Sequence, residues 1–345
     1  MPEISLAPKD LQRASAAALV AVNVPEGDAE LVARTLIAAD QRGIYSHGLL
    51  RLPLYVAAVE AGGINPRPDL RWRSGADAVA ILDADSAFGQ VAAHAAAEKS
   101  IDLARAHGVS TVAVEGSTHF GAGGWWSQML ADAGMIGIVT STTGPTVAPY
   151  GGAEAVLGTN PLSISIPSSE DHALTADMAT SAGAYGKVLA ANRAGSEIPE
   201  GWAIDPSGAP TTDPAQAMAG ALLPFGGHKG SAVSVLLEGL AASLTNAHYA
   251  FQTTDIWSTP SHRMNTGHLL IAIDTAAFSG AQHTADRAAD LQARVRSTGE
   301  SVLAPGDPEH HRCRAAASAV ALAPTTVDAL QQLFARLGVA PVSPL

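Results

Sequence analysis

Cysteine, aromatic residues and charged residues are all scarce in this sequence, and each scarcity excludes a class of protein. The chain has 345 residues but a single cysteine, Cys313, so no disulfide can form within it. Aromatic residues make up 5% and charged residues 15%, against 47% hydrophobic residues, which argues against disorder and for a sizeable core. Lys and Arg number 20 and Asp and Glu 32, and a net charge of −12 offers no electrostatic footprint for nucleic acid or an anionic membrane.

Long apolar runs are also missing. The most apolar helix candidate, residues 231–244, contains Glu238 and is too short to cross a bilayer. Residues 1–5 lack the basic start and the apolar stretch of a signal peptide. We therefore expect a cytoplasmic protein with no membrane and no nucleic acid among its partners.

One short segment near the C-terminus groups potential metal ligands. His310, His311 and Cys313 lie within four residues, but their spacing matches no standard ligand pattern, and neighbouring side chains point apart. We expect no metal site.

The hydrophobic pattern changes along the chain from helical to mixed. Residues 1–75 predict a helical domain, in which a second helix ends at Gly43 and a third runs from an N-cap at Ser46 to Gly62, kinked at Pro53. Residues 76–324 predict an α/β domain, and the helix at 325–340 is expected to join the helical one. The predicted strands are 79–82, 109–114, 136–140, 162–166, 174–177 and 269–273, and the predicted helices of this part are 90–106, 125–133, 229–244 and 285–296. We expect an ordered loop at 196–217, a turn at Pro305-Gly306 and a loose tail at 341–345.

The segment 43–55 carries the most informative side chains. If Ser46 caps a helix, then His47, Arg51 and Tyr55 follow at intervals of four residues on one face. Arginine can hold a carboxylate with two parallel hydrogen bonds, and histidine can take up a proton near neutral pH. The alternative is a surface helix whose polar stripe faces water.

Glycine-rich turns elsewhere could receive a phosphate-containing ligand. The segment 117–124, with His119 and Gly121, follows a predicted strand, but Trp126 stands where the dinucleotide fingerprint needs its third glycine. Further candidates are the turn around Thr159, Asp177 as an acceptor for ribose hydroxyls, and Lys229 in a glycine-rich turn before a long helix. The same residues could instead have structural roles: the glycines could form ordinary tight turns, Asp177 could cap a helix, and Lys229 could be an exposed surface lysine.

Taken in order, these segments resemble the malate/L-lactate dehydrogenase family, which also contains ureidoglycolate and sulfolactate dehydrogenases. The resemblance covers nearly the whole chain. The motifs that carry it are Ser46-His47-Gly48 with Arg51, His119-Phe120-Gly121, the turn 157–161, Asp177-Met178-Ala179-Thr180-Ser181, Gly186-Lys187, Ile198-Pro199, Gly201-Trp202-Ala203, the run 210–214, Leu223-Pro224, Lys229-Gly230 and Pro305-Gly306.

This resemblance implies a non-Rossmann nicotinamide-binding fold of α/β (α+β) class, with a mixed sheet plus a helical domain from the N-terminal region. It implies NAD or NADP as cofactor, with NAD favoured, and a small anionic substrate. It also implies a homodimer, in which the helical domain of residues 1–75 contributes to the dimer contact and completes the active site. By motif match, His47, His119 and Ser46 would be catalytic, and Arg51, Thr159 and Tyr55 would bind the substrate. The implied cofactor contacts are His119, Phe120, Gly121, Thr143, Asp177, Met178, Ala179, His228, Lys229, Pro305, Gly306 and Asp307.

The expected activity is hydride transfer between nicotinamide and a small 2-hydroxy or 2-keto acid of malate, lactate, ureidoglycolate or sulfolactate type. One alternative is reduction of a cyclic imine 2-carboxylate, disfavoured because Lys187 stands where related reductases have an aspartate. A serine hydrolase using Ser46 ranks lower, because no Gly-x-Ser-x-Gly elbow surrounds it. A protein that binds the cofactor without catalysis is the last alternative.

Overall fold

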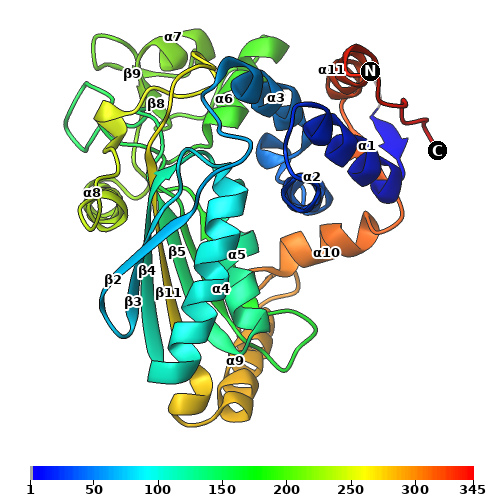
Figure 1. The fold of residues 1–345 in the computed structure, drawn as a ribbon. Helices are drawn as coiled ribbons and strands as arrows, with labels where there is room; N and C mark the ends of the chain where they lie inside the picture. Colours follow the sequence, from blue (N-terminus) through cyan, green and yellow to red (C-terminus); the bar gives the residue numbers. More distant parts are fainter. Residues whose placement is uncertain (1–2) are drawn as a thin grey trace.

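The computed structural model describes residues 3–345, apart from the side chain of Arg193. It is built around a mixed seven-stranded sheet of order β2-β3-β4-β11-β5-β6-β7 (Figure 1). β3 and β4 run parallel, and the other neighbouring strands are antiparallel. The predicted non-Rossmann α/β class is confirmed, since a Rossmann sheet is mostly parallel. The strands are β2 (Arg71–Ala76), β3 (Val79–Asp83), β4 (Val109–Ser117), β5 (Met135–Ser141), β6 (Leu162–Ile166), β7 (Leu174–Met178) and β11 (Thr266–Asp274).

Helices α4 (Gly89–His107) and α5 (Gly123–Asp132) cover one face of this sheet (Figure 1). α4 buries a stripe of small residues, which lets it pack closely on β4, and Gly108 ends it with a φ of +83°. α8 (His228–Ala242) contacts β4, β5 and β11, and α9 (Ala281–Arg296) contacts β7. No helix within residues 3–345 is both long and apolar enough to span a membrane.

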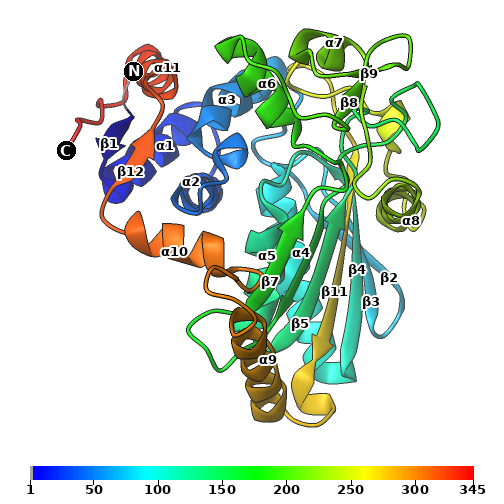
Figure 2. The same cartoon turned by 180° about the vertical axis from the view of Figure 1, so that it is seen from behind.

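The N-terminal helices form a layer beside the sheet. α1 (Pro8–Ala21), α2 (Glu26–Gln41), α3 (Leu52–Ala61) and α11 (Pro324–Arg336) pack together, and β1 (Ile4–Leu6) pairs with β12 (Val320–Leu322). α10 (Asp307–Ala315) lies between this layer and the sheet (Figure 2). Division into domains at 75/76 stays a prediction, and β2 runs across that boundary.

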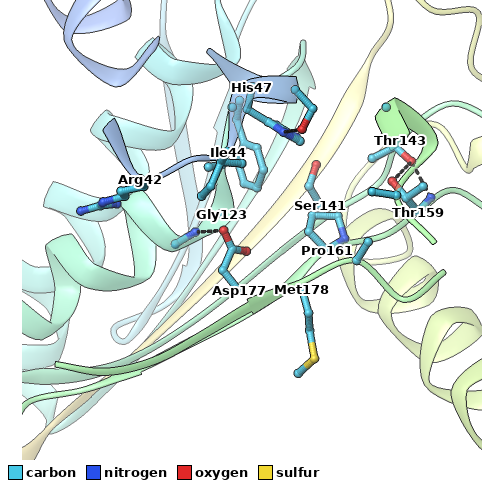
Figure 3. Close-up of a pocket in the computed structure, with 18 of the residues that line it drawn as sticks. Arg42, Ile44, His47, Gly123, Ser141, Thr143, Thr159, Pro161, Asp177 and Met178 are labelled. Carbon is cyan, nitrogen blue, oxygen red and sulfur yellow. Dashed lines mark hydrogen bonds between the residues drawn. The ribbon is translucent and has the colours of Figure 1, made fainter. Parts of the chain in front are cut away.

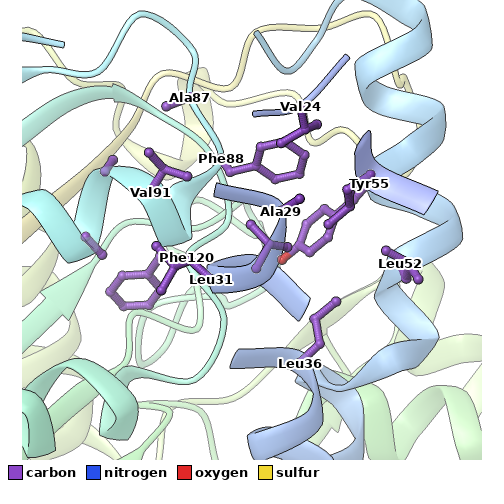
Figure 4. Packing of buried hydrophobic residues seen from close by; sticks show 14 of the residues in the cluster. Val24, Ala29, Leu31, Leu36, Leu52, Tyr55, Ala87, Phe88, Val91 and Phe120 are labelled. Atoms are coloured by element: carbon purple, nitrogen blue, oxygen red, sulfur yellow. The ribbon is translucent and has the colours of Figure 1, made fainter. Parts of the chain in front are cut away.

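One apolar core joins the helical layer to the sheet. Leu36, Leu52 and the ring of Tyr55 lie in the same buried cluster as Phe88 and Phe120 (Figure 4). At roughly 25 cal/mol per Å² of buried apolar surface, such shared burial holds the layer firmly against the sheet. The position of residues 44–52 relative to the sheet is therefore set by core packing.

The predicted loop at 196–217 is in part wrong. It contains β8 (Ala203–Ile204), β9 (Pro210–Thr211) and the start of α7 (Pro214–Ala219), whose first turn is capped by the Asp213 carboxylate. With β10 (Ala221–Leu222) the two strands form a small sheet beside α6 (Tyr185–Ala194), a helix that the pattern did not predict. Two-residue strands are too short to show a hydrophobic period, so the prolines dominated the prediction.

The predicted helix from Ser46 is also wrong at its start. Residues 45–47 and 49–51 form two 3-10 turns, η1 (Tyr45–His47) and η2 (Leu49–Arg51), and α3 begins only at Leu52. Pro53 sits in the first turn of α3, where its missing N–H costs no hydrogen bond, so no kink arises. The backbone N–H of Leu49 donates instead to the Asp40 carboxylate at 2.8 Å. Gly48 packs so closely on Asp40 that a Cβ there would lie 1.9 Å from Oδ1.

The predicted loose tail at 341–345 is ordered. The backbone N–H of Leu345 donates to the carbonyl of Ser5 at 3.0 Å, and Val342 is buried. The sequence offered no sign of this pairing, because the partner strand lies at the other end of the chain.

Candidate active site

A cavity of about 1050 Å³ lies between the helical layer and the sheet. Its walls come from η1 and η2, the β4–α5 connection, the ends of β5 and β7, α6, the start of α10 and the loop 255–264. This volume is at the upper end of the range for ligand sites, roughly 300–1,000 Å³, and suits a dinucleotide with a small substrate. The predicted residues that line it are Ser46, His47, Arg51, His119, Phe120, Gly121, Thr143, Thr159, Asp177, Met178, Ala179, Pro305 and Gly306.

Arg51 is held in place on two sides. Its Nε donates to the Ser46 carbonyl at 2.8 Å, and its guanidinium carbon lies 4.4 Å from the centre of the Trp257 ring. Among residues 3–345, no carboxylate lies within ion-pairing distance of this guanidinium. An unpaired cation whose remaining N–H groups border a cavity is suited to bind an anionic ligand.

His47 and His119 stack beside Arg51, with ring centres 5.2 Å apart. Burial, and then the Arg51 guanidinium, lower the pKa of His47 to about 4. Burial and the neighbouring His47 and Arg51 also lower the pKa of His119. Both imidazoles are therefore neutral near pH 7, the state in which a histidine can accept a proton.

Each imidazole has a hydroxyl partner. Ser46 Oγ lies 2.8 Å from Nδ1 of His47, and the Tyr55 hydroxyl lies 2.7 Å from Nδ1 of His119. Gln90 Nε2 in turn donates to the Tyr55 oxygen at 2.9 Å. Burial raises the pKa of Tyr55, so the phenol stays protonated. These contacts fix both rings and leave each Nε2 without a partner among them.

Another part of the wall holds Thr143 and Thr159, which lie in the loops next to β5 and β6, and the Asp177 carboxylate on β7 (Figure 3). The backbone N–H of Thr159 donates to Thr143 Oγ1 at 2.9 Å, which ties the two predicted residues together. Asp177 accepts from the backbone N–H of Gly124 at 2.8 Å, so it caps the first turn of α5 and also borders the cavity. Within the described residues, the buried hydroxyls of Thr146 and Thr266 line the cavity without a hydrogen-bond partner.

Four predicted site residues do not border the cavity. Tyr55 is fully buried behind His119. His228 and Lys229 are exposed at the start of α8. Asp307 is buried, and its carboxylate binds Arg296 rather than facing the cavity.

Other cavity residues were not predicted. Trp257 and Asp255 come from a loop without a motif, and Arg42 ends α2 with its Nη2 on Gln128. Gln90, which was also not predicted, lies outside the cavity and supports Tyr55 from the first turn of α4. The rarity of tryptophan, five in the chain, was the one signal that could have marked Trp257.

Asp171, His172 and His310 form a cluster whose ligand atoms lie within 4.8 Å of one another, an arrangement that could hold a metal ion. Each side chain already has a partner. His172 lies between Asp171 and Asp307, at 2.9 Å from each, and His310 lies 3.1 Å from Asp171. Arg296 binds both oxygens of Asp307, so the cluster is a complete ion-pair network that connects the β6–β7 loop to α9 and α10.

Two relatives show what such a chain resembles in sequence. It is 36% identical over 323 residues to a protein of Chromohalobacter salexigens named (2R)-3-sulfolactate dehydrogenase (NADP(+)), covering 94% of this chain and 96% of the relative. It is 38% identical over 294 residues to a protein of Escherichia coli K12 named ureidoglycolate dehydrogenase (NAD(+)), covering 84% of each.

The fold and the family model agree with this likeness. A solved structure of sulfolactate dehydrogenase from Methanocaldococcus jannaschii superimposes with a TM-score of 0.91 and 34% identity, over 97% of this chain and 98% of that one. Residues 6–331 match the family model described as malate/L-lactate dehydrogenase. The cavity, the unpaired arginine and the neutral histidines thus belong to a member of the malate/L-lactate dehydrogenase family of NAD(P)-dependent oxidoreductases.

Proposed function

We propose that this chain oxidises a small 2-hydroxy acid to the 2-keto acid, and catalyses the reverse reduction. The observation that carries the proposal is the unpaired Arg51 guanidinium beside two neutral imidazoles in one cavity. In the oxidation, C2 loses a hydride and the 2-hydroxyl loses a proton. The nicotinamide cofactor supplies the hydride acceptor when it is bound.

The cavity residues fit such a cofactor. The residues that would hold it line the cavity: Phe120, Gly121, Thr143 and the runs 177–179 and 305–306. The partnerless hydroxyls of Thr146 and Thr266 support this, since buried polar groups are nearly always hydrogen-bonded. Lys229 and His228 would contribute only through a movement or through a second copy of the chain.

Arg51 binds the substrate carboxylate, and the imidazole pair takes the hydroxyl proton. For His119 to accept at Nε2, its proton must sit on Nδ1 and be donated to the Tyr55 oxygen. The Tyr55 hydrogen then needs an acceptor, and Gln90 Oε1, buried and without a partner within the described residues, supplies one when the amide is turned over. Tyr55 and Gln90 are thus positioning residues for the base.

Replacing Arg51 tests this assignment. We expect Arg51→Ala to raise KM and to lower kcat/KM. The loss of transition-state stabilisation should be roughly 2–5 kcal/mol, the range for removing one partner of a buried charge pair. Arg51→Lys keeps the charge but loses the second of the two parallel hydrogen bonds, so its kcat/KM should lie between those of the parent enzyme and Arg51→Ala. The assay follows absorbance of reduced cofactor with malate, lactate, ureidoglycolate, sulfolactate and cyclic imino acids.

Arg336→Ala is the matched control, because Arg336 pairs with Glu60 on the surface. Near-normal kinetics of Arg51→Ala on each acid that the parent enzyme oxidises would refute the proposal that Arg51 binds the substrate carboxylate. Turnover of cyclic imines alone would replace the hydroxy-acid proposal by the reductase alternative.

We also propose a homodimer. The support is an exposed apolar face at α8, formed by Val235, Leu236, Leu240, Leu244 and Phe251. Apolar side chains gathered on one helix face usually mark an interface.

A further inference from the structure

We propose that Asp255 makes this enzyme select monoanionic substrates with a neutral hydrogen-bond donor over dianionic ones. The inference rests on the proposed function and names its substrate class. The preferred substrates are 2-hydroxy acids whose far end carries an amide, a ureide or a hydroxyl. Acids that carry a second carboxylate or a sulfonate are rejected.

Asp255 lies at the same end of the cavity as Arg51. Both side chains line the cavity. Trp257, which follows Asp255 by two residues, also lines it, and its ring stacks on the Arg51 guanidinium. The Asp255 charge acts to raise the pKa of both Arg51 and Tyr185, so it lies near both side chains. Asp255 also lies beside Gly144, where an added Cβ would lie 3.7 Å from Asp255 Oδ2.

The two oxygens of Asp255 are used unequally. Oδ1 accepts the backbone N–H of Trp257 at 3.0 Å and two bonds from Ser258, from its backbone N–H at 2.9 Å and its hydroxyl at 3.0 Å. This is an Asx-type turn that shapes the loop. No donor among the described residues engages Oδ2, so this oxygen is free to accept a bond from a ligand.

The charges around the cavity decide which ligand this can be. Among the side chains that the structure describes, the charged residues that line the cavity, histidines aside, are Arg42, Arg51, Asp177, Asp255 and Glu309. Arg42 binds Gln128, stacks on Trp125 and points away from the cavity centre (Figure 3). Arg51 is therefore the cation at the reacting end, and it binds the 1-carboxylate. Within the described part of the chain, a second anion would find no second cation there and would approach the Asp255 carboxylate.

A neutral donor reverses this balance. An amide or ureide N–H can bond Oδ2, and a hydrogen bond to a charged acceptor is about twice as strong as one between neutral groups. The second anion of a malate-like substrate instead repels Asp255. At a separation of several ångströms and an effective dielectric constant near 20, this repulsion is worth at least a tenfold difference in kcat/KM, on the order of tenfold to a hundredfold.

The test compares two substrates of the same size, malate and its 4-monoamide, which differ in a carboxylate against a carboxamide. We expect the parent enzyme to favour the monoamide in kcat/KM. Asp255→Asn keeps a carbonyl oxygen for the turn and removes the charge, and it should shift the ratio toward malate by about tenfold or more. Asp255→Ser, also a turn-forming residue, should shift it in the same direction.

Asp205→Asn is the control, because Asp205 Oδ1 accepts from Ser207 and Ala209 in a similar turn that lies outside the cavity. A parent enzyme that prefers malate, or a ratio unchanged in both Asp255 variants, would overturn the inference. Calorimetric Kd values of the two acids give the same ratio without turnover. Lack of oxidation of every hydroxy acid therefore refutes the proposed function, whereas the Kd ratio alone decides the role of Asp255.

Discussion

The protonation state of the two stacked imidazoles is set by their surroundings rather than by histidine chemistry alone. His47 and His119 share one cavity wall with the Arg51 guanidinium, and burial together with this cation disfavours a proton on either ring. A third neutral imidazole, His268, lies at the centre of the sheet between Ser117 and Ser141 at 2.7 and 2.8 Å, and burial lowers its pKa to about 3. The site thus holds two bases that are ready at neutral pH.

The pH dependence of substrate oxidation should show whether His47 and His119 are neutral near pH 7. The base must be unprotonated, and the pKa of His47 is lowered to about 4, so kcat/KM should stay level from pH 7 to about 5 and fall only as pH drops further. An exposed histidine would instead cause a fall near pH 6.5. The profile is measured with saturating cofactor, beside NMR titration of ¹³C-labelled histidine with His47→Gln for assignment. A midpoint near 6.5 in both measurements would contradict the neutral pair.

At the scale of elements, Asp40 decides how the segment before α3 folds. Its carboxylate takes the Leu49 N–H and leaves no room for a side chain at residue 48, which separates the two 3-10 turns that carry Ser46 and Arg51. Burial raises the pKa of Asp40 to about 7, against the opposing effect of the Leu49 N–H. The acid therefore ionises in the folded protein near neutral pH, well above the usual range of a carboxyl.

Asp40→Asn should change how stability depends on pH. Between the unfolded and folded pKa values the folded parent binds the extra proton, so its free energy of unfolding declines as pH rises toward 7. Asparagine keeps the acceptor for Leu49 without this decline. The advantage of the variant should therefore grow by about 3 kcal/mol between pH 5 and pH 8.

Urea unfolding at several pH values measures this difference, with Asp290→Asn as an exposed control. Parallel curves for the parent and the Asp40 variant would show that the carboxyl is not perturbed.

Helices and strands whose hydrophobic residues recur with a clear period were predictable from the sequence, and those without such a period were not. The stripes of α1, α4 and α8 and the strand β6 were found because apolar spacing and end glycines such as Gly108 agree. α10 was missed because its sequence, DPEHHRCRA, has no apolar face. The helix expected from Ser46 failed because spacing alone does not show the tertiary contact with Asp40.

The surface of the molecule carries an exposed apolar face at α8. Leu236 is 66% exposed, and Val235, Leu240 and Leu244 are exposed beside it. Figure 1 shows α8 beside the sheet, on the opposite side of the molecule from the helical layer. A second copy that covers this face would also lie near the start of α8, where His228 and Lys229 are exposed.

Charging this face should separate the copies. We expect the parent to sediment as a dimer at micromolar concentration and Leu236→Glu with Leu240→Glu to sediment as a monomer, because two buried, unpaired carboxylates oppose association. Phe278→Glu is the control, because Phe278 is as exposed as Leu236 but lies outside α8, directly after η4 (Thr275–Ala277). A monomeric parent, or a dimer that survives both substitutions, would refute the interface.

The site was predictable as a set of residue types, but less so as an arrangement. His47, Arg51 and His119 were identified from motif and chemistry, and the structure brings them together. Asp255 and Trp257 were not, because a loop of irregular backbone has no period and its position depends on the surrounding fold. Tyr55 was identified, but its place behind His119 depends on packing in the core.

The pairing of β1 with β12 affects how the protein can be made. The strand at residues 4–6 has its partner at 320–322, and Leu49–Arg51 packs against α11, which follows that partner. The last strand of the sheet, β11, ends at residue 274, so during synthesis the sheet can form before α11 emerges from the ribosome. The turn that carries Arg51 already packs on α2 and α3, but it gains its contact with α11 only afterwards, so the sheet side of the cavity can form before the arginine side is fully supported.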